Sequence, residues 1–205
     1  MIRKVITVFA VGVLLFLCWR QTAAAVAVRI GFDTAPDGSA IPSGTPVNSL
    51  FSSWGVTFDL VRCPSCAADP NVYAVGSCRG YLPYSVPNMV SMWNDGNCTP
   101  LTERLGVVQA NFAAPVDSVC LLVMPVRLGD QAVLRAYDSA GIEIATAYST
   151  PSATETVCIA APGIVRVSFG GAYLGYAWFD DLFARVAAVT PAARRSWGEL
   201  KTIYR

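Results

Sequence analysis

The chain contains no histidine, and the region 28–187 contains no lysine. The absence of histidine excludes Ser-His-Asp and Cys-His nucleophilic sites, and it excludes metal centres with histidine ligands. Two carboxylates would suffice for a glycosidase, but most acidic residues lie in turns, such as Asp69 and Asp138, or at alternating exposed positions, such as Glu143. Because no pair is marked out as acid and nucleophile, we expect no enzymatic activity.

The N-terminal residues follow the pattern of a secretory signal peptide. Arg3 and Lys4 form a basic start, residues 5–19 are apolar, and small residues lead up to Ala27. We expect residues 1–27 to be cleaved and the remainder to be secreted or held at the cell surface, with the membrane involved only before cleavage. The alternative is an uncleaved membrane anchor. The apolar segment is shorter than the roughly 20 residues of a spanning helix, which favours the signal peptide.

The charge balance gives no support for a nucleic-acid partner. Removal of residues 1–27 takes three of the 15 basic residues and leaves 12 against 14 acidic residues. Several of those 12 lie in the tail, 188–205, so the body has no basic face suited to nucleic acid. A capping-box pattern at Ser196 and Glu199 predicts a short helix in this tail. The tail is either a sorting tag or a frayed basic terminus.

The cysteines indicate disulfides. Cys18 falls in the signal segment and leaves six of the seven cysteines, an even number in an exported chain. We expect Cys120 to pair with Cys158, because both lie in strand-like runs. The other four would staple a long loop region, or would hold zinc as the alternative. They are Cys63, Cys66, Cys78 and Cys98.

The body predicts an all-β fold. It shows no helical periodicity of any length, and about ten short apolar or alternating segments recur at intervals of roughly 8–12 residues. The segments 131–137 and 142–148 flank a four-residue turn and predict a hairpin. The clearest segments are 28–33, 50–60, 107–112, 116–124, 131–137, 142–148, 154–160, 164–169 and 177–186. We expect one antiparallel β-sandwich of jelly-roll type over 28–187, with a Cys-rich insertion at 61–100 and the first and last strands side by side.

The last predicted strand, 177–186, carries two adjacent carboxylates in an aromatic run, although aspartate is depleted in strands. If the terminal strands pair, Asp33, Asp37 and one of Asp180 or Asp181 converge. Loop carbonyls would then complete a calcium shell of about six to eight oxygens. The alternative is that one aspartate accepts hydrogen bonds from backbone N–H groups at a strand end while its neighbour faces solvent.

Aromatic and amide side chains in the loops are candidates for binding sugar rings, because flat apolar rings stack on C–H faces and polar neighbours bind hydroxyls. The alternative is that these rings fill the core or cover sheet edges. The candidate ligand-binding residues are Tyr81, Tyr84, Trp93, Asn94, Asp95, Tyr173 and Tyr176.

Five short motifs, in this order, resemble secreted bacterial jelly-roll domains similar to carbohydrate-binding modules. They lie at 32–33, 54–58, 109–116, 136–141 and 179–182. Such domains often occur in exported proteins with C-terminal sorting tags, and the residues 196–205 look like a short tag of that kind. In these modules the first aspartate of the terminal pair often supports a structural calcium, which implies Asp180 here. The Cys-rich insertion departs from the pattern, so no ligand surface is carried over.

These observations favour a secreted, non-catalytic β-sandwich that binds a glycan or another cell-surface component. A structural or adhesive cell-surface protein without a small ligand is the alternative from another class. A glycan hydrolase is the third hypothesis. No cofactor other than the structural calcium is implied.

Overall fold

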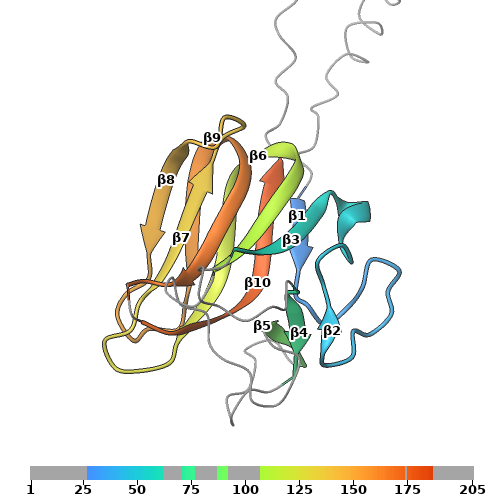
Figure 1. Ribbon diagram of the computed structural model, residues 1–205, viewed down its shortest axis with the longest axis horizontal. Helices are drawn as coiled ribbons and strands as arrows, with labels where there is room; N and C mark the ends of the chain where they lie inside the picture. Colours follow the sequence, from blue (N-terminus) through green and yellow to red (C-terminus); the bar gives the residue numbers. More distant parts are fainter. Residues whose placement is uncertain (1–26, 62–70, 77–86, 92–106, 174, 187–205) are drawn as a thin grey trace, which may run out of the picture. The chain divides into compact units, whose positions relative to one another are not determined.

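The computed structural model describes residues 27–61, 71–76, 87–91, 107–173 and 175–186 (Figure 1). All of them belong to one compact unit, Val26–Ala187. The elements are the strands β1 (Ala27–Ile30), β2 (Thr45–Pro46), β3 (Val56–Val61), β4 (Tyr73–Val75), β5 (Met89–Ser91), β6 (Val107–Pro125), β7 (Ala132–Tyr137), β8 (Glu143–Tyr148), β9 (Glu155–Gly171) and β10 (Ala177–Val186), with the short 3-10 helix η1 (Ser52–Trp54). The expected all-β antiparallel sandwich is confirmed.

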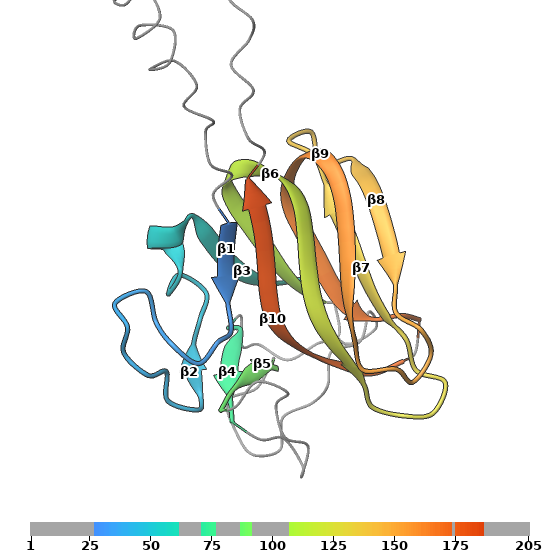
Figure 2. The ribbon, with the colours of Figure 1, turned by 180° about the vertical axis from the view of Figure 1, so that it is seen from behind.

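Ten strands form one hydrogen-bonded antiparallel sheet, which folds over into two layers. The first layer contains β8, β7, residues 164–171 of β9, residues 107–112 of β6, and β3. The second layer contains the remaining halves of β9 and β6 together with β10, which pairs with β1 and β5. Figures 1 and 2 show β6 and β9 bending over the same end of the sandwich.

The two long strands differ from the sequence-based expectation of four shorter ones. The segments 107–112 and 116–124 belong to the single 19-residue strand β6, and 154–160 and 164–169 belong to the 17-residue strand β9. Each bend contains a proline, Pro115 in β6 and Pro162 in β9. Proline supplies no N–H to a ladder, and the register between the two strands shifts across residues 111–118. Each of the two strands therefore turns a corner between the layers, and the ladder between them continues on both sides of the bend.

The expected pairing of the terminal strands is confirmed. β1 lies antiparallel to β10, with Ile30 opposite Leu182 and Ala27 opposite Arg185. The expected hairpin is also present, since β7 and β8 pair with Val133 opposite Tyr148 and Leu134 opposite Ala147.

The core lies between the layers and consists of the inward residues of both. Phe169 of the first layer meets Phe179 of the second, with ring centroids 5.0 Å apart. Phe32, Phe51 and Phe58 form a second aromatic group in the same core, with centroids 5.5–6.2 Å apart. These rings bury large apolar areas, which supply most of the stabilisation of such a fold.

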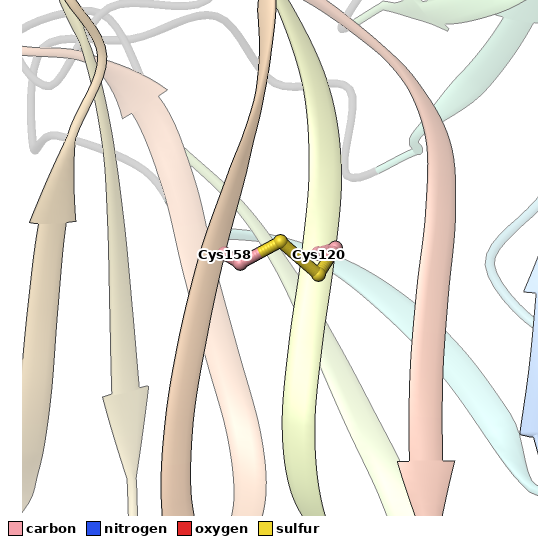
Figure 3. The surroundings of a disulfide bond; sticks show 2 residues. All are labelled: Cys120 and Cys158. Atoms are coloured by element: carbon pink, nitrogen blue, oxygen red, sulfur yellow. A yellow bond between two sulfur atoms is a disulfide. The ribbon is translucent and has the colours of Figure 1, made fainter.

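The Cys120–Cys158 disulfide is present as expected and joins β6 to β9 on the outer face of the second layer (Figure 3). The two cysteines are direct partners in the register, and their neighbours Val119, Leu121 and Val157 point into the core. The other four cysteines lie outside the described residues. Among the residues that are described, no helix is long and apolar enough to cross a membrane.

Candidate functional site

The outer face of the first layer carries two rows of polar side chains, which we call the polar face. Inward and outward residues alternate along each strand, so residues that are register partners share a face. One row crosses five strands through Thr57, Asn111, Arg166, Tyr137 and Glu143, and the next runs through Asp59, Gln109, Ser168, Arg135 and Thr146.

Hydrogen bonds link polar side chains of this face, two of them between neighbouring strands and one within β6. The amide nitrogen Nδ2 of Asn111 donates to Asp59 Oδ2 at 2.7 Å, and Nε2 of Gln109 donates to Asn111 Oδ1 at 2.8 Å. The Tyr137 hydroxyl and Ser168 Oγ are 3.2 Å apart. Asn111, Gln109 and Tyr137 are partly buried, and Ser168 is buried. The network holds these side chains in place before any ligand arrives.

Arg166 lies in the middle of the polar face and differs from the other charged residues there. Its guanidinium carbon is 4.7 Å from the centroid of the Tyr137 ring, within the range of a cation–π contact. Its Nε is buried without a hydrogen-bond partner. Arg135, two positions along β7 from Tyr137, forms an ion pair with Glu143 at 3.3 Å. No carboxylate of the described residues forms an ion pair with Arg166.

Two of the predicted aromatic candidates lie in the loop between β9 and β10, at the end of the sandwich opposite the two bends. Tyr173 is 73% exposed. The Tyr176 ring lies against Arg127 of the β6–β7 loop, with the guanidinium carbon 4.4 Å from the ring centroid. The N–H of Val126 donates to the Tyr176 carbonyl, which ties the two loops together. The other candidates, Tyr81, Tyr84, Trp93, Asn94 and Asp95, lie outside the described residues.

Asp33 follows β1 after Gly31 and Phe32 and is joined to the residue before β5. Its Oδ1 accepts the backbone N–H of Asn88 at 2.7 Å. The buried Asn88 side chain donates through Nδ2 to the carbonyls of Phe32 and Ile41 at 3.0 and 2.8 Å, while its Oδ1 has no partner. This junction ties the first strand to the middle of the second layer.

The terminal aspartate pair is split by a bulge. The register between β10 and β6 shifts between Asp180 and Leu182, and Asp181 has φ 42°. Asp180 is fully buried, and its Oδ1 accepts the N–H of Asp181 at 2.8 Å. Asp181 forms an ion pair with Arg29 at 3.3 Å.

Asp181 lies near Asp33 across Gly31. A Cβ added to Gly31 would lie 3.3 Å from Asp181 Oδ1 and 3.7 Å from Asp33 Oδ2. The third predicted ligand, Asp37, is exposed in a turn, where the hydroxyl and N–H of Ser39 donate to its carboxylate and hold its pKa below the ordinary value. Within the described ranges, no three His, Cys, Asp or Glu residues form a group suited to a metal ion.

Two oxygen-rich features at this junction fit a hard cation in part. Carboxylate oxygens of Asp33 and Asp181 both lie within 4 Å of where a Cβ would stand on Gly31, and the buried Oδ1 of Asn88 is an acceptor without a donor. Calcium takes carboxylate, amide and carbonyl oxygens of this kind. Arg29 already supplies one positive charge to Asp181 at the edge of the junction.

A shallow groove lies along the start of β1 at the edge of the second layer. Its volume is about 500 Å³, and Ala27, Val28, Arg29, Ser53 and Trp54 line it. The Trp54 ring, 39% exposed, rests on Phe51 with centroids 5.6 Å apart. The groove is mainly apolar and offers few groups that would orient a polar ligand.

The polar face is the feature that sequence reasoning missed. Alternation within 107–112 and 164–169 indicated which residues of each segment share a side. It gave no indication that the two segments pair, because that depends on β6 and β9 being single bent strands.

No protein-family model matches the chain, and no curated protein matches it. Several solved structures are similar. The K2 cleaved adhesin domain of Lys-gingipain aligns over 78% of this chain and 99% of its own, with 11% identity and a TM-score of 0.49. A mutant of the family 29 carbohydrate-binding module CBM29-2 aligns over 78% of this chain and 92% of its own, with 12% identity and a TM-score of 0.36. The CBM22-1 and GH10 modules of a Clostridium thermocellum endo-1,4-beta-D-xylanase, complexed with xylohexaose, align over 69% of this chain and only 26% of that structure, with 11% identity and a TM-score of 0.39. These identities and TM-scores are too low to transfer a function to this chain.

Proposed function

We propose that this protein is an exported, non-catalytic β-sandwich that binds a polysaccharide across its polar face. The observation that carries the proposal is the pair of polar rows over five strands, which hydrogen bonds link on either side of Arg166. Export is proposed from residues 1–27 alone, and N-terminal sequencing of the protein from the culture medium tests it.

The dimensions and chemistry of the face suit a sugar chain. Four gaps between five adjacent strands span about 19 Å, enough for an oligosaccharide to lie across the sheet. The rows offer both donors and acceptors through the amides of Gln109 and Asn111 and the hydroxyls of Ser168 and Thr146. Sugar hydroxyls are also both donors and acceptors, so a preformed mixed array binds them without leaving groups unpaired.

A polysaccharide panel tests this function. We would compare retention of wild type and of the double variant Gln109→Ala/Asn111→Ala by affinity electrophoresis in gels that contain neutral and acidic polysaccharides. Thr156→Ala is the matched control, because Thr156 is exposed on β9 in the second layer, away from the polar face. We expect the double variant to lose retention and the control to keep it.

The panel also separates the main alternative. If wild type is retained by no polysaccharide, the protein is a structural or adhesive module without a sugar ligand. If the double variant is retained as well as wild type, the ligand binds elsewhere. Tyr173 in the exposed loop is then the first residue to replace, by Ala.

We further propose that the Asp33–Asp181 junction holds a structural calcium ion, with Asn88 Oδ1 and loop carbonyls as further oxygen ligands. The two carboxylates beside Gly31 and the unpaired Asn88 oxygen support this proposal. A cation that binds only the folded state raises the melting temperature by mass action. We expect calcium to raise it relative to EDTA in wild type and to have no effect in Asp33→Asn. Asparagine at position 33 can still accept the hydrogen bond from the Asn88 N–H. A lost response to calcium would therefore reflect the lost carboxylate charge and not the loss of this hydrogen bond. An unchanged wild-type melting temperature in calcium would mean that the junction is held by hydrogen bonds alone.

A further inference from the structure

We propose that Arg166 binds a carboxylate of the polysaccharide, so that the ligand class is an acidic polysaccharide built with uronic acids. This inference rests on the proposed function of the polar face and names the ligand that the face selects.

The other charged side chains of the polar face have partners. Arg135 and Glu143 form an ion pair at 3.3 Å, and Asp59 accepts a hydrogen bond from Asn111 at 2.7 Å. Arg166 is a cation for which the described residues supply no anion. Asp59 lies on β3 at one edge of the face, where it bonds to a neutral amide, whereas Arg166 lies at the centre of the face. A ligand group that complements the central charge is negative.

The position of Arg166 prepares it for such a group. It is half-buried, and its guanidinium is held over the Tyr137 ring, which limits the side-chain freedom that binding would otherwise remove. It lies in the third of five strands, with Asn111 on one side and Tyr137 on the other. A sugar chain that lies along the row of Thr57, Asn111, Arg166, Tyr137 and Glu143 passes over it.

The guanidinium also has unused hydrogen-bonding capacity. Its Nε is buried and has no hydrogen-bond partner. The other end of the guanidinium lies beside the β7–β8 turn, where Nη2 is 3.6 Å from the position of a Cβ built on Gly141. Arginine presents its N–H groups as a planar fork that matches the two oxygens of a carboxylate. A small turn of the guanidinium on binding would direct this fork to the ligand, and a neutral sugar offers no group of equal charge.

Matched polysaccharide pairs test the inference. Polygalacturonate, alginate and hyaluronan would each be compared with their carboxyl-reduced forms, which keep the backbone and remove the charge. Binding would be measured by isothermal titration calorimetry at physiological salt, where loosely placed surface charges are screened. We expect wild type to bind at least one acidic form about 10-fold or more tighter than its reduced form, as a charge-assisted hydrogen bond implies.

Variants assign the preference to one residue. Arg166→Gln should lose the preference for the acidic form while binding the reduced form as wild type does. Arg166→Lys, which keeps the charge without the fork, should retain part of it. Arg185→Gln is the matched control, because Arg185 pairs with Asp117 on the second layer. Circular dichroism confirms that each variant is folded.

The outcomes separate the two proposals. If wild type binds reduced or neutral polysaccharides as tightly as acidic ones, the uronic-acid inference is wrong and the proposed function stands. An acid preference that survives in Arg166→Gln also overturns the role of Arg166. If no polysaccharide of either kind binds, both proposals fail.

Discussion

Removal of the Cys120–Cys158 disulfide should cost a large part of the stability of this fold. The two cysteines are 38 residues apart, and the bridge excludes many open conformations of the unfolded chain. The loop-closure relation gives about 13 cal/mol/K for a loop of this length, or about 4 kcal/mol at 25 °C. A domain of this kind is stable by only about 5–15 kcal/mol, so the loss is readily measurable.

The perturbation is the double substitution Cys120→Ser/Cys158→Ser. Cys158 is exposed and Cys120 half-buried, so serine hydroxyls at these positions can reach water and leave no apolar cavity. Reduction of wild type is unsuitable, because it would also reduce any bridges among the other cysteines. The matched control is Ser118→Ala/Ala160→Ser, which exchanges a neighbouring register pair on the same two strands.

Urea unfolding, followed by the fluorescence of buried Trp178, measures the effect. We expect the serine variant to unfold at lower urea with a slightly larger m-value, because its unfolded chain exposes more surface. The control should remain within about 0.5 kcal/mol of wild type. A loss below about 1 kcal/mol in the serine variant would refute the reasoning. It would mean that the unfolded chain is already restrained over this span.

Three further predictions concern single residues, each measured by urea unfolding. Asn88→Ala should lower the free energy of unfolding by about 2–4 kcal/mol, because two buried carbonyls lose their donor; a loss under about 1 kcal/mol would mean that water replaces it. Phe179→Ala, in the core, should cost about 3–5 kcal/mol and Phe183→Ala, on the outer face, about 1 kcal/mol or less. Equal costs would contradict the assigned faces. Asp181→Val should cost over 1 kcal/mol more than Asp181→Asn, since β-branched residues avoid positive φ and asparagine tolerates it; equal stability would place Asp181 outside that region.

The fold class followed from local patterns in the sequence. Short alternating segments separated by turn residues predicted an antiparallel sandwich, and the four-residue turn after Tyr137 predicted the β7–β8 hairpin. The Cys120–Cys158 bridge was predictable because both cysteines lie in strand-like runs. These features depend on residues close together in the chain, or on chemistry that has few alternatives.

The polar face was not predictable in the same way. Arg166 and Ser168 showed the period of two that a half-exposed strand requires, and Gln109 and Asn111 showed it too. Their meeting depends on the long-range register between β6 and β9 and on the bends at Pro115 and Pro162. The segments expected from the sequence end before each proline and start again after it, because proline usually interrupts a strand ladder. Here each proline lies at the corner of a strand that continues in the other layer.

The adjacent aspartates of β10 show how one inserted residue changes the reading of a strand. Strict alternation would place Asp180 and Asp181 on opposite faces and return Phe179 and Asp181 to the same side. Phe179 and Leu182 both point into the core, three positions apart, so one residue between them is extra. Asp181 is that residue; it leaves Asp180 buried on the outer side and brings its own carboxylate to Gly31.

This arrangement assigns the two layers different tasks. β10 pairs with β6 along one edge and with β1 and β5 along the other, and its outward Trp178 is buried with Tyr73 and Met89. Its carboxylates bond to the strand itself and to Arg29. The second layer therefore joins the ends of the domain, and a ligand that needs an extended array of donors and acceptors finds it on β3, β6, β9, β7 and β8. For that reason substitutions at Arg166 should change ligand choice with little effect on folding, whereas substitutions at the Asp33–Asp181 junction should change stability first.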